Sequence, residues 1–240
     1  LLTTEGGALV VDKVRGYVDA DTGGGSIRMY EIGGAIRAVT AGGNITLEMI
    51  TGHVRAETAG GSIHLEHGRD DAILETSGGN ITAQSVGGKL TAETLGGSIQ
   101  ADQVKGDVVA DTSGGFIRLA RVDGTIDVET AGGSIQIDSA SGGIRAETAA
   151  GAIHLTNVAG TVRAVSAAGA IYVIFSERFP LEESLLETSV GSIVVTLPET
   201  LALRVEADID FAKNRNRIRS DFPSIQVSNR EGVFTGGITA

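Results

Sequence analysis

The feature that most constrains this chain is an internal repeat of 18 residues. A Thr or Ser recurs at this spacing from Thr4 to Ser166, and Thr188 follows after a longer step of 22 residues. Three positions after each of these residues stands a glycine, and two positions further stands Leu or Ile. The hydroxyl residues are Thr4, Thr22, Thr40, Thr58, Thr76, Thr94, Thr112, Thr130, Thr148, Ser166 and Thr188. A short fixed period is the signature of a solenoid, whose stacked units share one core.

Within one unit, apolar and polar residues alternate with the period of a β-strand. Val54, Ala56 and Thr58 share one side of a first strand, and Ile63 and Leu65 share one side of a second strand after a Gly-Gly corner. A second corner follows, usually with another glycine six positions before the Thr. Helix is excluded, because the period is two and Gly-Gly interrupts the pattern about once per unit.

These observations predict an all-β fold, a right-handed parallel β-solenoid with 18-residue coils and two short strands per coil. About eleven regular coils would stack at about 4.8 Å per coil. Alanine recurs at one inward position, so the core should be thin: Ala20, Ala38, Ala56, Ala92, Ala110, Ala146 and Ala164. The inward hydroxyls should bond to the coils above and below. The corner glycines should serve either a positive φ or a close approach to the coil below.

The regular repeat is expected to cover residues 1–198, with an insertion loop at about residues 174–184. Residues 199–240 break the pattern and are expected to form irregular capping coils of the same domain, because an open solenoid end needs a cap. A basic run from Lys213 to Arg219 lies in this part and could instead be a docking patch.

Composition excludes several classes of protein. The net charge of −11 disfavours binding to nucleic acid, whose phosphates would be repelled. Without cysteine the chain has no disulfide and no thiolate metal site. No apolar run is long enough for a membrane span. A leader or anchor is expected to lie outside this sequence, and no cofactor is predicted.

The position before each hydroxyl residue faces outward and is mostly acidic. It is occupied by Asp21, Glu57, Glu75, Glu93, Asp111, Glu129 and Glu147, among others. Stacked carboxylates repel by about 1 kcal/mol per neighbouring pair in water. Arginines two positions earlier relieve this only in some coils. The ladder is either a solvated face or a strip that binds cations or a partner.

One corner departs from the repeat, because Asp70 replaces its glycine. Histidines and carboxylates gather within eight residues there and could ligate a metal, although a solvated corner also explains them. The weak candidates are His64, Glu66, His67, Asp70 and Asp71. His53 and His154 stand alone in the sequence.

Enzymatic activity is not expected. A carbohydrate-active β-helix enzyme using carboxylates on one face is the alternative, but such enzymes shape their pockets with long loops that this repeat lacks. Calcium-binding β-rolls carry Gly-Gly-x-Gly-x-Asp corners, whereas here Gly-Gly is followed by Ser-Ile. A scaffold that polymerises end to end is a further alternative.

The units Glu57–Ile63 and Glu129–Ile135, and the later segments Gly191–Pro198 and Ile218–Pro223, resemble the repeats of a bacterial adhesin family of domains of unknown function. The resemblance implies a glycine-rich β-solenoid at the cell surface, elsewhere in the bacterial cell envelope, or outside the cell. It also implies a further coil beyond Ala240. The family offers no catalytic residues to transfer. We therefore expect a non-enzymatic structural or interaction module whose partner is a surface protein, a polysaccharide or a second copy of itself.

Overall fold

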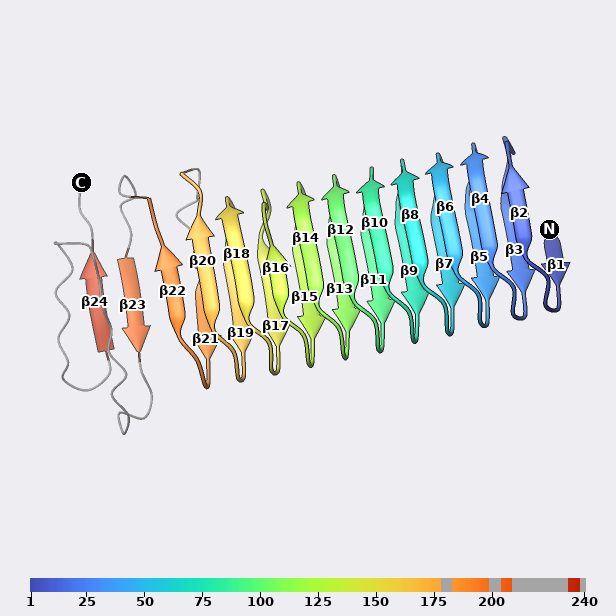
Figure 1. Ribbon diagram of the computed structural model, residues 1–240. Coiled ribbons are helices and arrows are strands. Elements are labelled where there is room, and N and C mark those ends of the chain that lie inside the picture. Colours follow the sequence, from blue (N-terminus) through green and yellow to red (C-terminus); the bar gives the residue numbers. More distant parts are fainter. Residues whose placement is uncertain (178–182, 199–203, 209–232, 238–240) are drawn as a thin grey trace. The chain divides into compact units, whose positions relative to one another are not determined.

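The computed structural model describes residues 1–177, 183–198, 204–208 and 233–237, the last two ranges as backbone strands (Figure 1). Within these ranges the regular elements are all β-strands. The chain divides into two compact units, Leu1–Thr196 and Leu197–Ala240. The first unit is a stack of coils, each made of one odd-numbered and one even-numbered strand. The predicted all-β solenoid of about eleven coils is therefore confirmed.

The strands of the first unit form two sheets of eleven strands each. Sheet 1 comprises β1 (Leu2–Thr4), β3 (Val18–Thr22), β5 (Ile36–Thr40), β7 (Val54–Thr58), β9 (Ala72–Thr76), β11 (Leu90–Thr94), β13 (Val108–Thr112), β15 (Ile126–Thr130), β17 (Ile144–Thr148), β19 (Val162–Ser166) and β21 (Leu185–Thr188). Sheet 2 comprises β2 (Leu9–Asp12), β4 (Ile27–Ile32), β6 (Ile45–Ile50), β8 (Ile63–Gly68), β10 (Ile81–Val86), β12 (Ile99–Val104), β14 (Ile117–Val122), β16 (Ile135–Ile137), β18 (Ile153–Val158), β20 (Ile171–Phe175) and β22 (Ile193–Thr196).

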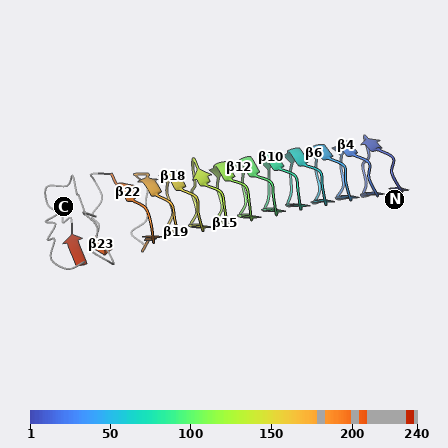
Figure 2. The ribbon, with the colours of Figure 1, turned by 60° about the horizontal axis from the view of Figure 1, so that its bottom comes forward.

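Pairing within each sheet is parallel, and the register follows the sequence period. Thr58 pairs with Thr76, and Ile63 pairs with Ile81, each one repeat further along the chain. Seen from a second direction, each coil is a flattened loop with one strand on either side (Figure 2). Residues at the same position of successive coils therefore stand in straight columns. A residue type that recurs in the repeat forms a continuous line on the surface.

The core between the sheets is thin and aliphatic. Inward residues of both sheets are almost completely buried, and the middle inward position of most sheet 1 strands is alanine. Ala56 in β7 and Leu65 in β8 are typical of one coil. In the next coil the sizes are exchanged, since Leu74 lies in β9 and Ala83 in β10. This exchange conserves the volume of these two coils, whereas the following coil has alanine in both sheets, at Ala92 and Ala101.

The hydroxyl column ties each coil to the one before it. The Thr112 hydroxyl donates to the carbonyl oxygen of Gly97 in the preceding coil at 2.7 Å. The hydroxyl oxygen of Thr112 also accepts the backbone N–H of Gly115 in its own corner at 3.2 Å. The side chains therefore bond to backbone groups that no strand ladder would satisfy. Equivalent bonds to the preceding coil are made by Thr22, Thr40, Thr58, Thr76, Thr94, Thr130, Thr148, Ser166 and Thr188.

We expect Thr112→Val to destabilise the stack by about 1–3 kcal/mol, because a buried carbonyl and a buried N–H lose their partner at nearly constant side-chain volume. Denaturant midpoints of the variant and the wild type would measure this. Thr112→Ser is the control, since Ser166 occupies the same column and keeps the bond to the preceding coil. A valine variant as stable as the serine variant would contradict the role given to the hydroxyl.

The second residue of each Gly-Gly corner must be glycine because it lies against the backbone of the preceding coil. A positive φ is not the reason. A Cβ added to Gly97 would lie 1.9 Å from the carbonyl oxygen of Gly79 in the preceding coil. A Cβ added to its neighbour Gly96 would meet nothing closer than 3.7 Å. The sequence suggests two reasons for these glycines, a positive φ or a close approach to the coil below. The structure supports the second.

Gly97→Ala should therefore lower the thermal midpoint far more than Gly96→Ala, because only the first methyl group collides with backbone. The two variants differ by one position and add the same atom, so each serves as the control for the other. Melting curves followed by circular dichroism measure the difference. Equal midpoints would show that the stack can open locally to admit the methyl group.

The irregular segment after the tenth coil is shorter than expected. Ile174 and Phe175 belong to β20, and Phe175 is buried, so the predicted insertion loop at 174–184 starts two residues too early. Val173 and Phe175 point inward and Ile174 points outward, so the strand alternation continues here. The sequence does not show it, because all three residues are apolar. Residues 178–182 of this loop lie outside the described residues.

In the second unit, β23 (Arg204–Asp208) and β24 (Val233–Gly237) pair antiparallel, unlike the parallel coils of the first unit. The basic run from Lys213 to Arg219 and the segment Ile218–Pro223 lie outside the described residues.

Candidate functional site

The predicted acidic ladder is a continuous column on the outer face of sheet 1. Parallel pairing places the following carboxylates in six successive coils, hereafter the acidic column: Glu57, Glu75, Glu93, Asp111, Glu129 and Glu147. Asp21 stands in the same register but is separated from the column by Val39. Strand spacing puts neighbouring members about 4.8 Å apart at the backbone.

Arginines compensate only the two ends of the acidic column. Arg55 forms ion pairs with Glu57 and, at 3.5 Å, with Glu75. At the other end Glu147 pairs with Arg145 at 2.8 Å and with Arg163 at 3.6 Å. A hydrogen bond to Asp127, aided by the charge of Glu147, raises the pKa of the Arg145 guanidinium.

The centre of the acidic column has no such ion pairs, although Glu129 is close enough to Arg145 for its charge to help raise the pKa of that guanidinium. Among the described residues, Glu93, Asp111 and Glu129 form no ion pair within 4.0 Å. The neighbouring outward column carries Thr91 and Val109 beside the first two of them, where the ends have arginine. The negative potential of the face is therefore concentrated over three coils in the middle of the stack.

The column also lines a shallow groove. Its members Glu57, Glu75, Glu93 and Asp111 border an open hollow of about 570 Å³, together with corner residues that include the exposed Leu95. A smaller hollow of about 270 Å³ lies beside Glu129 and Glu147. Both are open to solvent along their length, so they fit an extended partner better than an enclosed small molecule.

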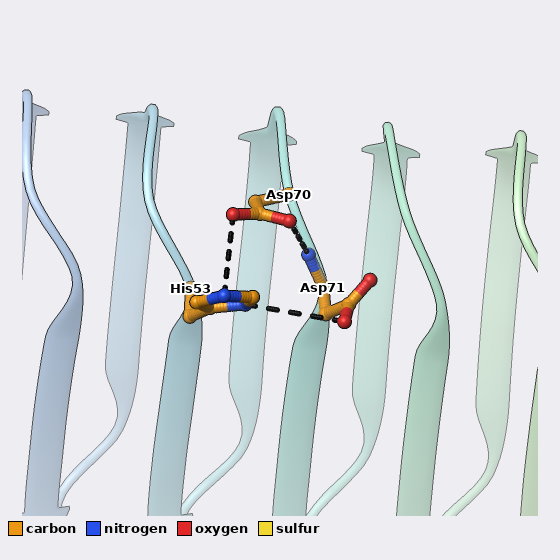
Figure 3. A group of neighbouring side chains, drawn as sticks. All are labelled: His53, Asp70 and Asp71. Atoms are coloured by element: carbon orange, nitrogen blue, oxygen red, sulfur yellow. Dashed lines mark hydrogen bonds and ion pairs between the residues drawn. The ribbon is translucent and has the colours of Figure 1, made fainter.

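The irregular corner brings together a different set of residues from the one expected. Asp70 and Asp71 lie between β8 and β9, and His53 lies beside them in the preceding corner, between β6 and β7 (Figure 3). His53 Nε2 is 3.4 Å from Asp70 Oδ2, and His53 Nδ1 is 4.0 Å from Asp71 Oδ2. The expectation that His53 stands alone is therefore wrong.

The other weak metal candidates lie on β8, away from this group. His64 and Glu66 occupy the outer face of sheet 2, and His67 Nδ1 is 3.6 Å from Glu66 Oε1. Among the described residues, the only group of three potential metal ligands is His53, Asp70 and Asp71. His154 is also not isolated, because its ring stacks on Tyr172 with centroids 4.7 Å apart.

A carboxylate at this type of corner also has a structural role. Asp71 Oδ1 accepts the backbone N–H of Lys89 in the next coil at 2.8 Å. Two coils further, Asp107 Oδ1 accepts both the backbone N–H and the hydroxyl of Thr125, each at 2.8 Å. Both bonds lower the pKa of Asp107, and the bond from the backbone N–H has the larger effect. Asp107 is therefore a natural reference for Asp71, with the same backbone contact and no histidine.

Comparison of the chain with models of protein families, with curated proteins and with solved structures finds no match. No helix in the described part of the chain is long and apolar enough to cross a membrane.

We expect Asp111→Asn to stabilise the protein by up to about 1 kcal/mol at low ionic strength, because it removes repulsion from Glu93 and Glu129. Glu147→Gln should instead destabilise by about 0.5 kcal/mol, because it breaks two partly exposed ion pairs. Denaturant midpoints at low and high salt measure both effects, which should shrink as salt is added. A shift of both variants in one direction would contradict this account of the charge distribution.

Proposed function

We propose that this chain is a non-enzymatic interaction module of the bacterial cell envelope, in which the acidic column holds a cationic partner. The observation that supports the proposal is the uncompensated centre of the column, Glu93, Asp111 and Glu129. The partner would be an extended segment of protein or polysaccharide that presents positive charges along its length.

The geometry of the column suits such a partner. A parallel stack fixes carboxylates at a spacing of about 4.8 Å, and an extended peptide places side chains of one face about 6.6–6.8 Å apart. Flexible Lys or Arg side chains can bridge that difference. Because the column is built on strands, its charges need little ordering when a partner binds.

A purely solvated face would explain the acidic residues less well. Alternating charges would give equal solubility without repulsion between neighbours, and the chain does place Arg145 and Arg163 beside Glu147. Among the described residues, the carboxylates of the three central coils form no ion pair with an arginine. A binding surface for cations accounts for the difference, since the repulsion within the column is relieved only when a partner binds.

The location rests on the resemblance of Glu57–Ile63 and Glu129–Ile135 to the repeats of bacterial adhesin domains. A surface module that binds other molecules needs no enclosed pocket. The open grooves beside the column are compatible with that role.

A fluorescent oligolysine peptide tests the proposed surface directly. Binding, followed by fluorescence anisotropy at low salt, should weaken about ten-fold in the triple variant Glu93→Gln/Asp111→Asn/Glu129→Gln, if each lost ion pair contributes about 0.5 kcal/mol. The matched control, Glu5→Gln/Asp102→Asn/Asp123→Asn, changes the net charge equally at exposed positions away from the column. Equal weakening in both variants, or no binding by the wild type, would overturn the proposal.

A further inference from the structure

We infer that the corner formed by His53, Asp70 and Asp71 is a binding site for a divalent transition metal of the zinc type. One potential ligand atom from each residue lies within 4.8 Å of the other two. The inference is independent of the acidic column, because none of these residues belongs to it.

The distance between His53 and Asp70 is close to that which a bound ion requires. Zn²⁺ binds His nitrogen at about 2.0–2.1 Å and carboxylate oxygen at about 2.0–2.2 Å, so ligand atoms around a tetrahedral ion lie about 3.4 Å apart. His53 Nε2 and Asp70 Oδ2 are separated by 3.4 Å. Asp71 Oδ2 lies nearer the other ring nitrogen, 4.0 Å from His53 Nδ1, so the exposed side chains of His53 and Asp71 must rotate to bring the third ligand to the ion.

Both carboxylates are oriented by backbone groups through the oxygen that the ion would not use. Asp70 Oδ1 accepts the N–H of Asp71 at 3.0 Å, and Asp71 Oδ1 accepts the N–H of Lys89 at 2.8 Å. The other oxygen of each side chain, Oδ2, faces His53 (Figure 3). Such bonds hold ligands in position in the way that outer-shell partners do around known metal ions.

The corner also departs from the repeat at Asp70 and at two residues close to it. Eight other coils carry glycine at the position of Asp70, and a Cβ at the adjacent Gly52 would lie 2.5 Å from backbone of the preceding coil. Gly68 and Ala72, on either side of the two aspartates, replace the larger inward residues of neighbouring coils. Three departures within five residues set this corner apart from one that only turns the chain.

The donor set selects the class of metal. One imidazole nitrogen with two carboxylates favours Zn²⁺ and similar ions over Ca²⁺ and Mg²⁺, which prefer sites made only of oxygen. Two aspartates balance the charge of a divalent ion when His53 is neutral. Three protein ligands leave positions for water, so the ion would be exchangeable, and it would link two successive coils.

Isothermal titration of tag-free protein with ZnCl₂ tests this site, with CaCl₂ and MgCl₂ titrated separately. We expect one Zn²⁺ per chain at this corner, and binding at least about ten-fold weaker in His53→Gln and in Asp70→Gly. Asp70→Gly restores the glycine of the repeat, so this variant should fold as well as the wild type. The visible spectrum of bound Co²⁺ should lose its histidine-dependent features in His53→Gln.

Two variants serve as controls. Asp107→Asn removes a carboxylate that makes the same backbone contact without a histidine, and His64→Gln removes a histidine of the neighbouring strand. Both should bind Zn²⁺ like the wild type. The site is disproved if the wild type shows no binding at millimolar Zn²⁺, or if His53→Gln and Asp70→Gly bind as tightly as the wild type. Loss of binding in His64→Gln alone would also disprove it.

Discussion

The backbone contact between successive coils at the Gly-Gly corners is the constraint on which the rest of this structure depends. The carbonyl oxygen of one corner glycine lies where the side chain of the next would be, about 2 Å from the missing Cβ. The same oxygen accepts the hydroxyl of the Thr column, as Gly97 does from Thr112. Because both contacts recur at every coil, the register cannot slip by one residue without losing all of them together. Straight columns of side chains are the direct consequence.

The arrangement of the side chains in columns accounts for which features the sequence predicts and which it does not. Strand alternation and the 18-residue period are local signals, so the two sheets, the inward alanines and the acidic column follow from them. The His53 site does not follow from a search of neighbouring residues, because its parts come from two coils. His53 and Asp71 are separated by one period in the sequence, so a search at that spacing would have found them. The predicted loop wrongly includes Ile174 and Phe175, which belong to β20. The run is apolar on both faces of this strand, so the sequence shows no alternation there.

The strict register also limits how charge can be arranged on the face of sheet 1. A carboxylate in each coil must stand beside the carboxylate of the next, and only the adjacent column can offer compensation. Arg55 and Arg145 provide it at the two ends, each bridging to more than one acid. Replacing arginine by Thr91 or Val109 in the middle removes it there. The adjacent column, which holds Arg55, Thr91, Val109 and Arg145, therefore decides where the face of sheet 1 stays uncompensated. The acidic residues alone would give a uniformly charged face.

The same geometry makes the two proposed sites chemically distinct although both contain carboxylates. In the acidic column each side chain stands on the outer face of a strand, so the column offers charge at fixed spacing but no convergent ligands. At the corner, the chain turns, and the turn brings side chains of two coils toward one point with backbone N–H groups fixing one oxygen of each aspartate. Convergence of nitrogen and oxygen donors favours a single metal ion, whereas a linear array favours an extended cation. One repeat therefore produces two kinds of recognition, on its strands and at its corners.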